Sequence, residues 1–158
     1  MSVNSDVRLL QQVPLFAEVD SAHLQVLVFS SKRQTISDGA YVFKKGKLGQ
    51  AAFFVLSGSG VVRADNSSSS AIIARVKKGA LLGETSMVGR VPYSISVQAA
   101  KKMEVLKLTN DTFMRVCEEF PEVGKTVLRV LADKLDTSLK GFSDVQRRFD
   151  NAKSFSDL

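Results

Sequence analysis

The pattern of hydrophobic and polar residues divides the chain into three parts. Residues 1–30 place apolar side chains at helical spacing, whereas residues 32–108 consist of short β-branched and aromatic runs separated by glycines. Residues 110–149 return to helical spacing. Repeated glycines between short strands are typical of a β-roll with tight corners, similar to a jelly roll. We therefore expect one mostly β domain with flanking helices over residues 1–150 and a polar tail over 151–158.

Local signals place the individual elements. Pro14 separates two N-terminal helices, and Asp20 is the predicted cap of the second. The polar segment Asp65–Ser70 predicts a hairpin loop within the β-rich part. The strand candidates are residues 41–43, 52–56, 61–63, 71–76, 94–97 and 104–108.

Two helices are predicted after the β-rich part. Asn110 is the expected cap of a short helix, and Pro121 suits the first turn of a longer helix that runs to about Phe149. One apolar row of this helix (Val123, Val127 and Val130) is expected to pack on the β-rich body. A second row follows alternating steps of three and four residues, with one polar break at Ser138, and predicts a helix-to-helix homodimer seam. The seam consists of Leu128, Leu131, Leu135, Phe142, Val145 and Phe149. The alternative is that both rows belong to one intramolecular core.

Composition excludes several chemistries. The chain has 158 residues, of which 44% are hydrophobic, so it is long enough to bury a core without a metal or a disulfide. Cys117 is the only cysteine and His23 the only histidine, which rules out an internal disulfide and a Cys/His zinc site. No catalytic dyad is visible, and we expect no enzyme. The apolar runs are too short to span a bilayer and the N-terminus has no secretory pattern, so we expect a cytoplasmic protein.

The positive charge is concentrated in the middle of the chain. The formal net charge is +6, yet residues 31–110 alone hold thirteen lysines and arginines against four acids. Such an excess favours an anionic partner, although a solvated basic surface without a partner fits equally well.

The segment 83–97, with the sequence GETSMVGRVPYSISV, carries the clearest candidate chemistry. A glycine at 83 lets the backbone turn into a short helix whose first N–H groups are free to hold a phosphate. Glu84 can accept hydrogen bonds from a hydroxyl group, or it can serve as a first-turn acid that favours the helix dipole.

Together with other motifs, this segment resembles the cyclic-nucleotide-binding domain of catabolite-activator-type regulators, kinase regulatory subunits and gated channels. The other matching motifs are Val13–Phe16, Gly39–Phe43, Gly46–Gly49 and Phe53–Gly58, and the resemblance extends from about residue 9 to 149. It implies that 83–97 is a phosphate-binding cassette in which Glu84 holds a ribose 2′-hydroxyl. The implied ligand is cyclic AMP, cyclic GMP or another small anion. The implied ligand-binding residues are Gly83, Glu84, Thr85, Ser86, Arg90, Tyr93, Ser94 and Ser138.

The cassette departs from the family at one position. Where the family places an arginine against the cyclic phosphate, this chain has Tyr93, although Ser94 matches the small residue beside it. The loss of a charged bidentate contact is expected to weaken binding by about two to four powers of ten. Arg90 either substitutes for the missing arginine or faces solvent. Ser138 falls where catabolite-activator-type proteins place a hydroxyl on the adenine.

The sequence therefore predicts a non-enzymatic, dimeric sensor or regulatory domain without a bound cofactor, which signals to an unknown downstream protein by repositioning its long C-terminal helix. One alternative is a decayed ligand site that serves as a protein-interaction and dimerisation module. Another is the regulatory part of a transcription regulator. Sequence-specific DNA binding is not expected, because only nine residues follow Phe149 and leave no room for a helix-turn-helix.

Overall fold

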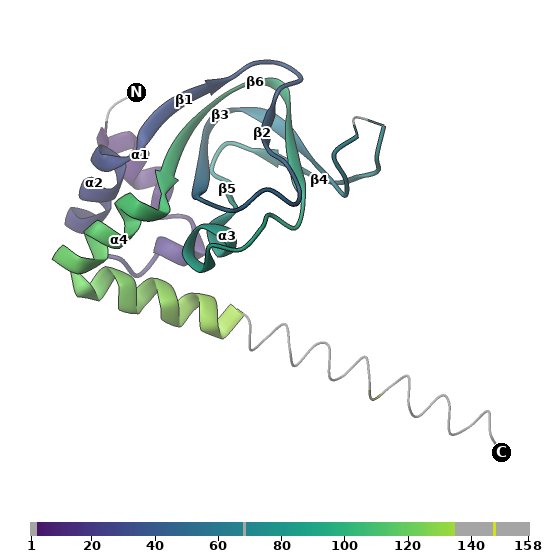
Figure 1. Cartoon of the computed structure of the whole chain (residues 1–158). Helices are drawn as coiled ribbons and strands as arrows, with labels where there is room; N and C mark the ends of the chain where they lie inside the picture. The colour runs from purple at the N-terminus through teal and green to yellow at the C-terminus, as the bar shows by residue number, and fades with distance from the viewer. Residues whose placement is uncertain (1–2, 68, 135–146, 148–158) are drawn as a thin grey trace.

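The computed structural model describes residues 3–67, 69–134 and 147. Helices pack at one end of an antiparallel β-roll (Figure 1). The helical elements are α1 (Val3–Leu10), η1 (Pro14–Phe16), α2 (Ser21–Ser30), α3 (Glu84–Gly89) and α4 (Asn110–Glu119). The strands are β1 (Lys32–Ile36), β2 (Tyr41–Phe43), β3 (Ala51–Arg63), β4 (Ile72–Lys77), β5 (Leu81–Leu82) and β6 (Ser96–Thr109). This arrangement confirms the predicted fold class.

Two long strands form the centre of the roll. β3 and β6 pair from Ala51 opposite Thr109 to Arg63 opposite Ser96, and the sheet order is β1-β6-β3-β4. β2 also pairs with β6, and β5 with β3. The sequence predicted each long strand as two short ones. The prediction was wrong because β3 continues through Gly58 and bends there at irregular pairing instead of ending.

The strand run 51–56 is apolar throughout because both of its faces are buried. Ala52, Phe54 and Leu56 belong to a core beneath the helices, and the alternate residues belong to a core inside the roll. The core beneath the helices also contains Val123 and Val127, two residues of the apolar row that was expected to pack on the body of the protein. The two cores therefore meet across one strand.

Helix ends follow the predicted signals with one exception. Asp20 caps α2, since its Oδ1 accepts a hydrogen bond of 2.9 Å from the Ala22 N–H. The predicted cap Asn110 is instead the first residue of α4, and Thr109 is the cap, with its hydroxyl accepting from the Thr112 N–H. The side chain of Asn110 is turned toward the cassette, as described below.

The long helix begins at Pro121 as predicted and is described as far as residue 134. Of the predicted seam, Leu128 is 56% exposed, whereas Leu131 packs against the core beneath the helices. Leu131 is partly buried and contacts the body of its own chain, and its place in a seam between two chains stays a prediction. The remaining seam positions, Leu135, Phe142, Val145 and Phe149, lie outside the described residues.

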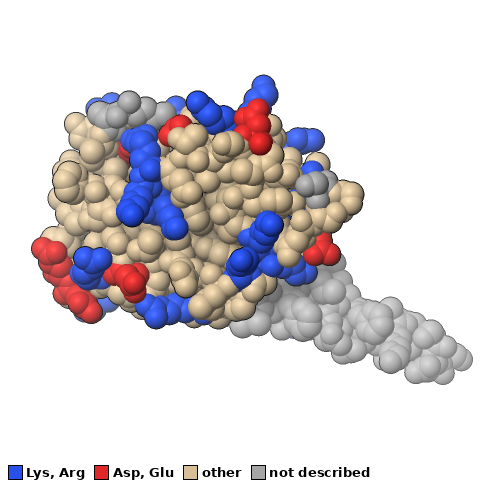
Figure 2. Space-filling view, turned by 45° about the horizontal axis from the view of Figure 1, so that its top comes forward, with Lys and Arg blue, Asp and Glu red and all other residues tan. Residues whose placement is uncertain are grey.

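The basic residues of segment 31–110 lie on the roll and its loops. On the face shown in Figure 2, lysines and arginines stand in separate groups with uncharged surface between them. Several arginines are paired: Arg33 contacts the buried carboxylate of Asp6 at 2.6 Å, and Arg90 contacts Asp111 at 2.9 Å. The positive charge is thus divided into local groups.

A substitution at Gly58 tests the bend in β3. We expect Gly58→Ala to lower the free energy of unfolding by about 2–5 kcal/mol, because its φ is +87° and a Cβ there would lie 2.2 Å from the Lys102 carbonyl oxygen. The matched control is Gly39→Ala, which has a φ of +79° but no atom within 4 Å, and it should cost about 1–2 kcal/mol. Equal losses in urea denaturation of the two variants would contradict the close approach at Gly58.

Candidate functional site

The cassette begins at a glycine that no other residue replaces easily. Gly83 has a φ of +76° and precedes α3, whose first hydrogen bond runs from the Met87 N–H to the Gly83 carbonyl at 2.9 Å. A Cβ at position 83 would lie 2.9 Å from Cε1 of Tyr93. The glycine therefore supplies both the left-handed backbone and the space that lets Tyr93 lie against the start of the helix.

The end of the cassette is fastened to the loop between β2 and β3. The Tyr93 N–H donates to the Lys47 carbonyl, the Gly46 N–H donates to the Tyr93 carbonyl, and the Gly49 N–H donates to Val91, each at 2.9 Å. These ladder-like bonds hold residues 91–93 and 46–49 as one rigid unit.

Tyr93, at the position where the resemblance places an arginine, points into the protein. It is 7% exposed, its hydroxyl donates a hydrogen bond of 2.6 Å to the Ala51 carbonyl, and its ring stacks on Phe43 with centroids 4.0 Å apart. Burial raises the pKa of the Tyr93 phenol, and backbone hydrogen bonds at Ala51 and Gln50 offset part of that rise. The hydroxyl is already engaged with the backbone, so it offers no donor to a phosphate.

The structure brings most of the predicted site residues to one cavity of about 180 Å³, here called the cassette cavity. It is lined by Phe43, Gly83, Glu84, Thr85, Ser86, Tyr93, Ser94 and Ile95. The lining includes three residues with aliphatic hydroxyls and one with a carboxylate, and it contains no lysine or arginine. The volume lies below the range of about 300–1,000 Å³ that complete small-molecule sites occupy. The cassette cavity thus fits part of a nucleotide, such as a ribose.

Glu84 connects the cassette cavity with the long helix. Its side chain is 17% exposed and its Oε1 lies 3.2 Å from Nζ of Lys134. Glu84 and Lys134 also line a neighbouring cavity of about 470 Å³ between residues 12–15, residues 79–82 and the long helix. The Glu84 carboxylate thus lies between the cassette cavity and the long helix.

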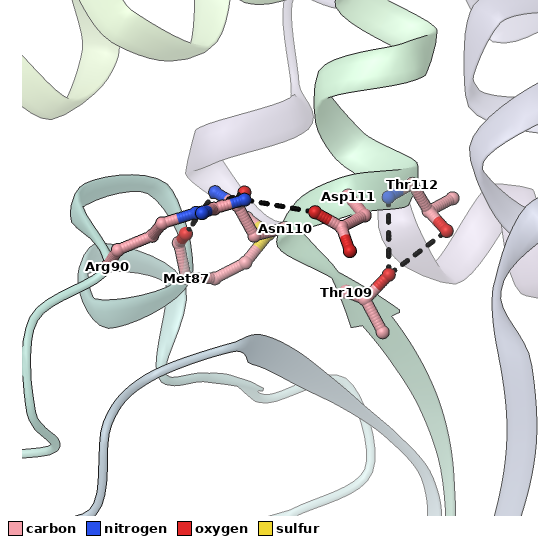
Figure 3. A network of polar contacts seen from close by, with 6 residues as sticks. All are labelled: Met87, Arg90, Thr109, Asn110, Asp111 and Thr112. Atoms are coloured by element: carbon pink, nitrogen blue, oxygen red, sulfur yellow. Dashed lines mark hydrogen bonds and ion pairs between the residues drawn. The ribbon is translucent and has the colours of Figure 1, made fainter.

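Arg90 does not line the cassette cavity. Its Nε donates a 2.7 Å hydrogen bond to Oδ1 of Asn110, and its guanidinium also pairs with Asp111, as Figure 3 shows. Asn110 in turn donates to the Met87 carbonyl at 2.7 Å. The network ties the end of α3 to the start of α4. Arg90, which has a φ of +53°, is 62% exposed and paired at the surface, so it faces solvent; a role as a substitute phosphate ligand stays a prediction.

Some site residues were missed and one is not described. Phe43, Ile95 and Lys134 line the cavities; Phe43 and Ile95 lie in motifs that the sequence singled out, whereas Lys134 lies in none. Ser138, the predicted base contact, lies outside the described residues. Within the described part of the chain, no group of three His, Cys, Asp or Glu residues is placed to hold a metal. Among the same residues no helix is both long and apolar enough to cross a membrane.

Comparisons with known proteins agree with this geometry. The sequence profile of the family described as "Cyclic nucleotide-binding domain" matches residues 33–120, which include the whole cassette. A cyclic nucleotide-gated potassium channel of Mesorhizobium japonicum is 30% identical over 118 residues, which are 75% of this chain and 32% of the channel. The chain thus spans about a third or less of the length of the first curated relatives that it matches.

Solved structures share the fold. The N-terminal domain of a transcriptional regulator from Streptomyces coelicolor matches with a TM-score of 0.75 and 25% identity, over 82% of this chain and 94% of that domain. The regulatory domain of Toxoplasma gondii PKA, solved with cAMP, matches with a TM-score of 0.69 and 20% identity, over 85% of this chain and 50% of that one.

The buried hydroxyl of Tyr93 is expected to stabilise the fold. Tyr93→Phe should lower the free energy of unfolding by about 1–2 kcal/mol, because a buried hydrogen bond is lost and the Ala51 carbonyl loses a partner. Tyr41→Phe is the matched control, since its hydroxyl makes an exposed 3.0 Å bond to the Asn66 carbonyl, and it should cost less. Thermal denaturation of both variants measures the difference; an equal effect would argue against the buried bond.

The raised pKa of Tyr93 predicts a loss of stability in alkali. The folded state holds the phenolic proton more tightly than the unfolded chain, so this contribution is complete below pH about 10 and is lost as the pH rises through the raised pKa. In the Tyr41→Phe variant Tyr93 is the only phenol. Its absorbance should titrate at higher pH in the native protein than in denaturant, and coincident titrations would refute the burial.

Proposed function

This chain belongs to the cyclic nucleotide-binding domain family, and on that premise we propose that it is a non-enzymatic regulatory domain that senses a small ligand at the cassette cavity. The ligand is a cyclic nucleotide or another small anion with a hydroxyl group, which Glu84 binds, while Ser94 contacts the anionic part. The observation that carries the proposal is that Glu84 lines the cassette cavity and also pairs with Lys134 of the long helix.

The proposed signal is a change in the position of the long helix. A ligand shifts an equilibrium only when it binds one conformation better than the other. Ligand hydroxyls that take up the Glu84 carboxylate weaken its bond to Lys134, and thereby favour a helix position in which that bond is absent. Leu128 on the same helix is exposed and would move with it. A partner, such as a second copy of the chain, could detect the position of the helix by binding to this surface.

The cassette is atypical, and its affinity for cyclic phosphates is correspondingly low. Tyr93 supplies neither the charge nor the free donor of an arginine, and Arg90 is held by Asn110 and Asp111. We therefore keep the expected penalty of about two to four powers of ten in affinity.

Titration calorimetry with cyclic AMP and cyclic GMP tests the proposal. We expect weak binding by the wild type and a further loss of about tenfold or more in Glu84→Gln, because a charged hydrogen-bond acceptor is replaced by a neutral one. Arg90→Ala is the matched control; it should keep the wild-type affinity, since Arg90 faces away from the cassette cavity.

The absence of both heat and a thermal shift at millimolar nucleotide would remove the sensor function for these ligands. That result would favour the second candidate, a protein-interaction module whose ligand site has decayed. The observation in its favour is the lining of the cassette cavity, which has a carboxylate and no cation for a phosphate.

A further inference from the structure

The stacked residues Tyr93 and Phe43 also line a second cavity. Besides the cassette cavity, both residues line a cavity of about 320 Å³ that opens between β2, the start of β3 and β6. Lys44, Lys47 and Lys107 line this space, which we call the basic cavity. The two aromatic rings therefore separate a cavity with one carboxylate and no cation from a cavity with three lysines and no acid.

The charge of the basic cavity is not neutralised by its surroundings. No salt bridge among the described residues involves Lys44, Lys47 or Lys107. Next to it lies a space of about 280 Å³ that shares Leu48, Gln50 and Lys107 and also contains Arg90 and Asp111. Because those two charges pair with each other, the neighbouring space leaves the excess of the three lysines intact. A concave surface lined by one sign of charge concentrates counter-ions of the opposite sign.

The lysines stand on a rigid support. Lys44 and Lys47 flank a turn in which the Lys47 N–H donates to the Lys44 carbonyl at 3.2 Å, and residues 46–49 are bonded to 91–93. Lys107 projects from β6, with its Nζ 6.0 Å from the centre of the Phe53 ring. The backbone that carries the lysines is thus fixed, so that only their side chains have to be ordered when a ligand arrives.

We propose that the basic cavity is a second binding site, specific for a small molecule that carries two or more negative charges on phosphate groups. Its ammonium groups hold the phosphates as point charges, and its floor of Phe43, Phe53 and Tyr93 accepts an apolar or planar part of the same molecule. The volume of the basic cavity, about 320 Å³, lies within the range of about 300–1,000 Å³ that small-molecule sites occupy. The site does not depend on ligand binding in the cassette cavity.

The proposal is tested by titrating the full chain with inorganic pyrophosphate. The variant Lys44→Ala/Lys47→Ala/Lys107→Ala should bind about tenfold more weakly or worse, since three partly exposed charge contacts are lost. The matched control is Lys77→Ala/Lys101→Ala/Lys102→Ala, which removes the same charge from exposed lysines that line neither cavity, and it should bind nearly as the wild type does. Replacing the three cavity lysines with arginine keeps the charge and should restore most of the affinity.

Equal losses in the two alanine variants would overturn the proposal, because the anion would then respond only to net charge. No binding by the wild type at millimolar pyrophosphate would overturn it as well. Neither result bears on the cassette, because cyclic nucleotide binding is measured separately. Conversely, lysine-dependent binding of pyrophosphate by a chain that ignores cyclic nucleotides would support the second site and remove the sensor function for those nucleotides.

Discussion

The hydrogen bond from the Tyr93 hydroxyl to the Ala51 carbonyl is the contact on which the functional part of this molecule depends. A phenol can be buried at this position only because its O–H has a partner, here at 2.6 Å, and because its ring stacks on Phe43. The bond places Tyr93 against the first residue of β3 and directs its side chain inward. The segment before it is held by the loop between β2 and β3, so the whole cassette has one defined position.

The same contact determines the electrostatics on both sides of the stacked rings. In the cassette cavity an aromatic ring lies at the position where the resemblance places an arginine, so that Glu84 is the only charged residue in the described lining, with Lys134 beside it at 3.2 Å. On the other side the ring forms part of the floor beneath three lysines. The net charge of +6 therefore says little about the chemistry of either cavity. That chemistry depends on which charged residues line the cassette cavity and which line the basic cavity.

Much of the fold was predictable because the relevant signals are local. Pro14, Asp20 and Pro121 act through backbone geometry and nearby N–H groups, and the apolar run at 51–56 reflects a strand that is buried on both faces. The merging of short strands into β3 and β6 was not predictable, because a glycine that ends a strand and one that bends it look the same in sequence. The difference at Gly58 lies in its close approach to the Lys102 carbonyl, a contact made 44 residues along the chain.

The candidate site was predictable as a set of positions but not as a set of roles. The motif placed six of its residues around one cavity. The direction of Tyr93 depends on Ala51 and Phe43, and the direction of Arg90 depends on Asn110, so these roles arise from tertiary contacts that no spacing encodes.

If the rings of Tyr93 and Phe43 separate two spaces of opposite electrostatic character, an anion should enter one space and not the other. A backbone amide NMR titration of the labelled protein with pyrophosphate distinguishes the two spaces. The amides of residues 44–50 should shift and saturate, while those of Gly83, Glu84 and Ser86 should stay in place. Shifts at Gly83–Ser86 that leave residues 44–50 unmoved would show that the anion enters the cassette cavity, and would refute the separation.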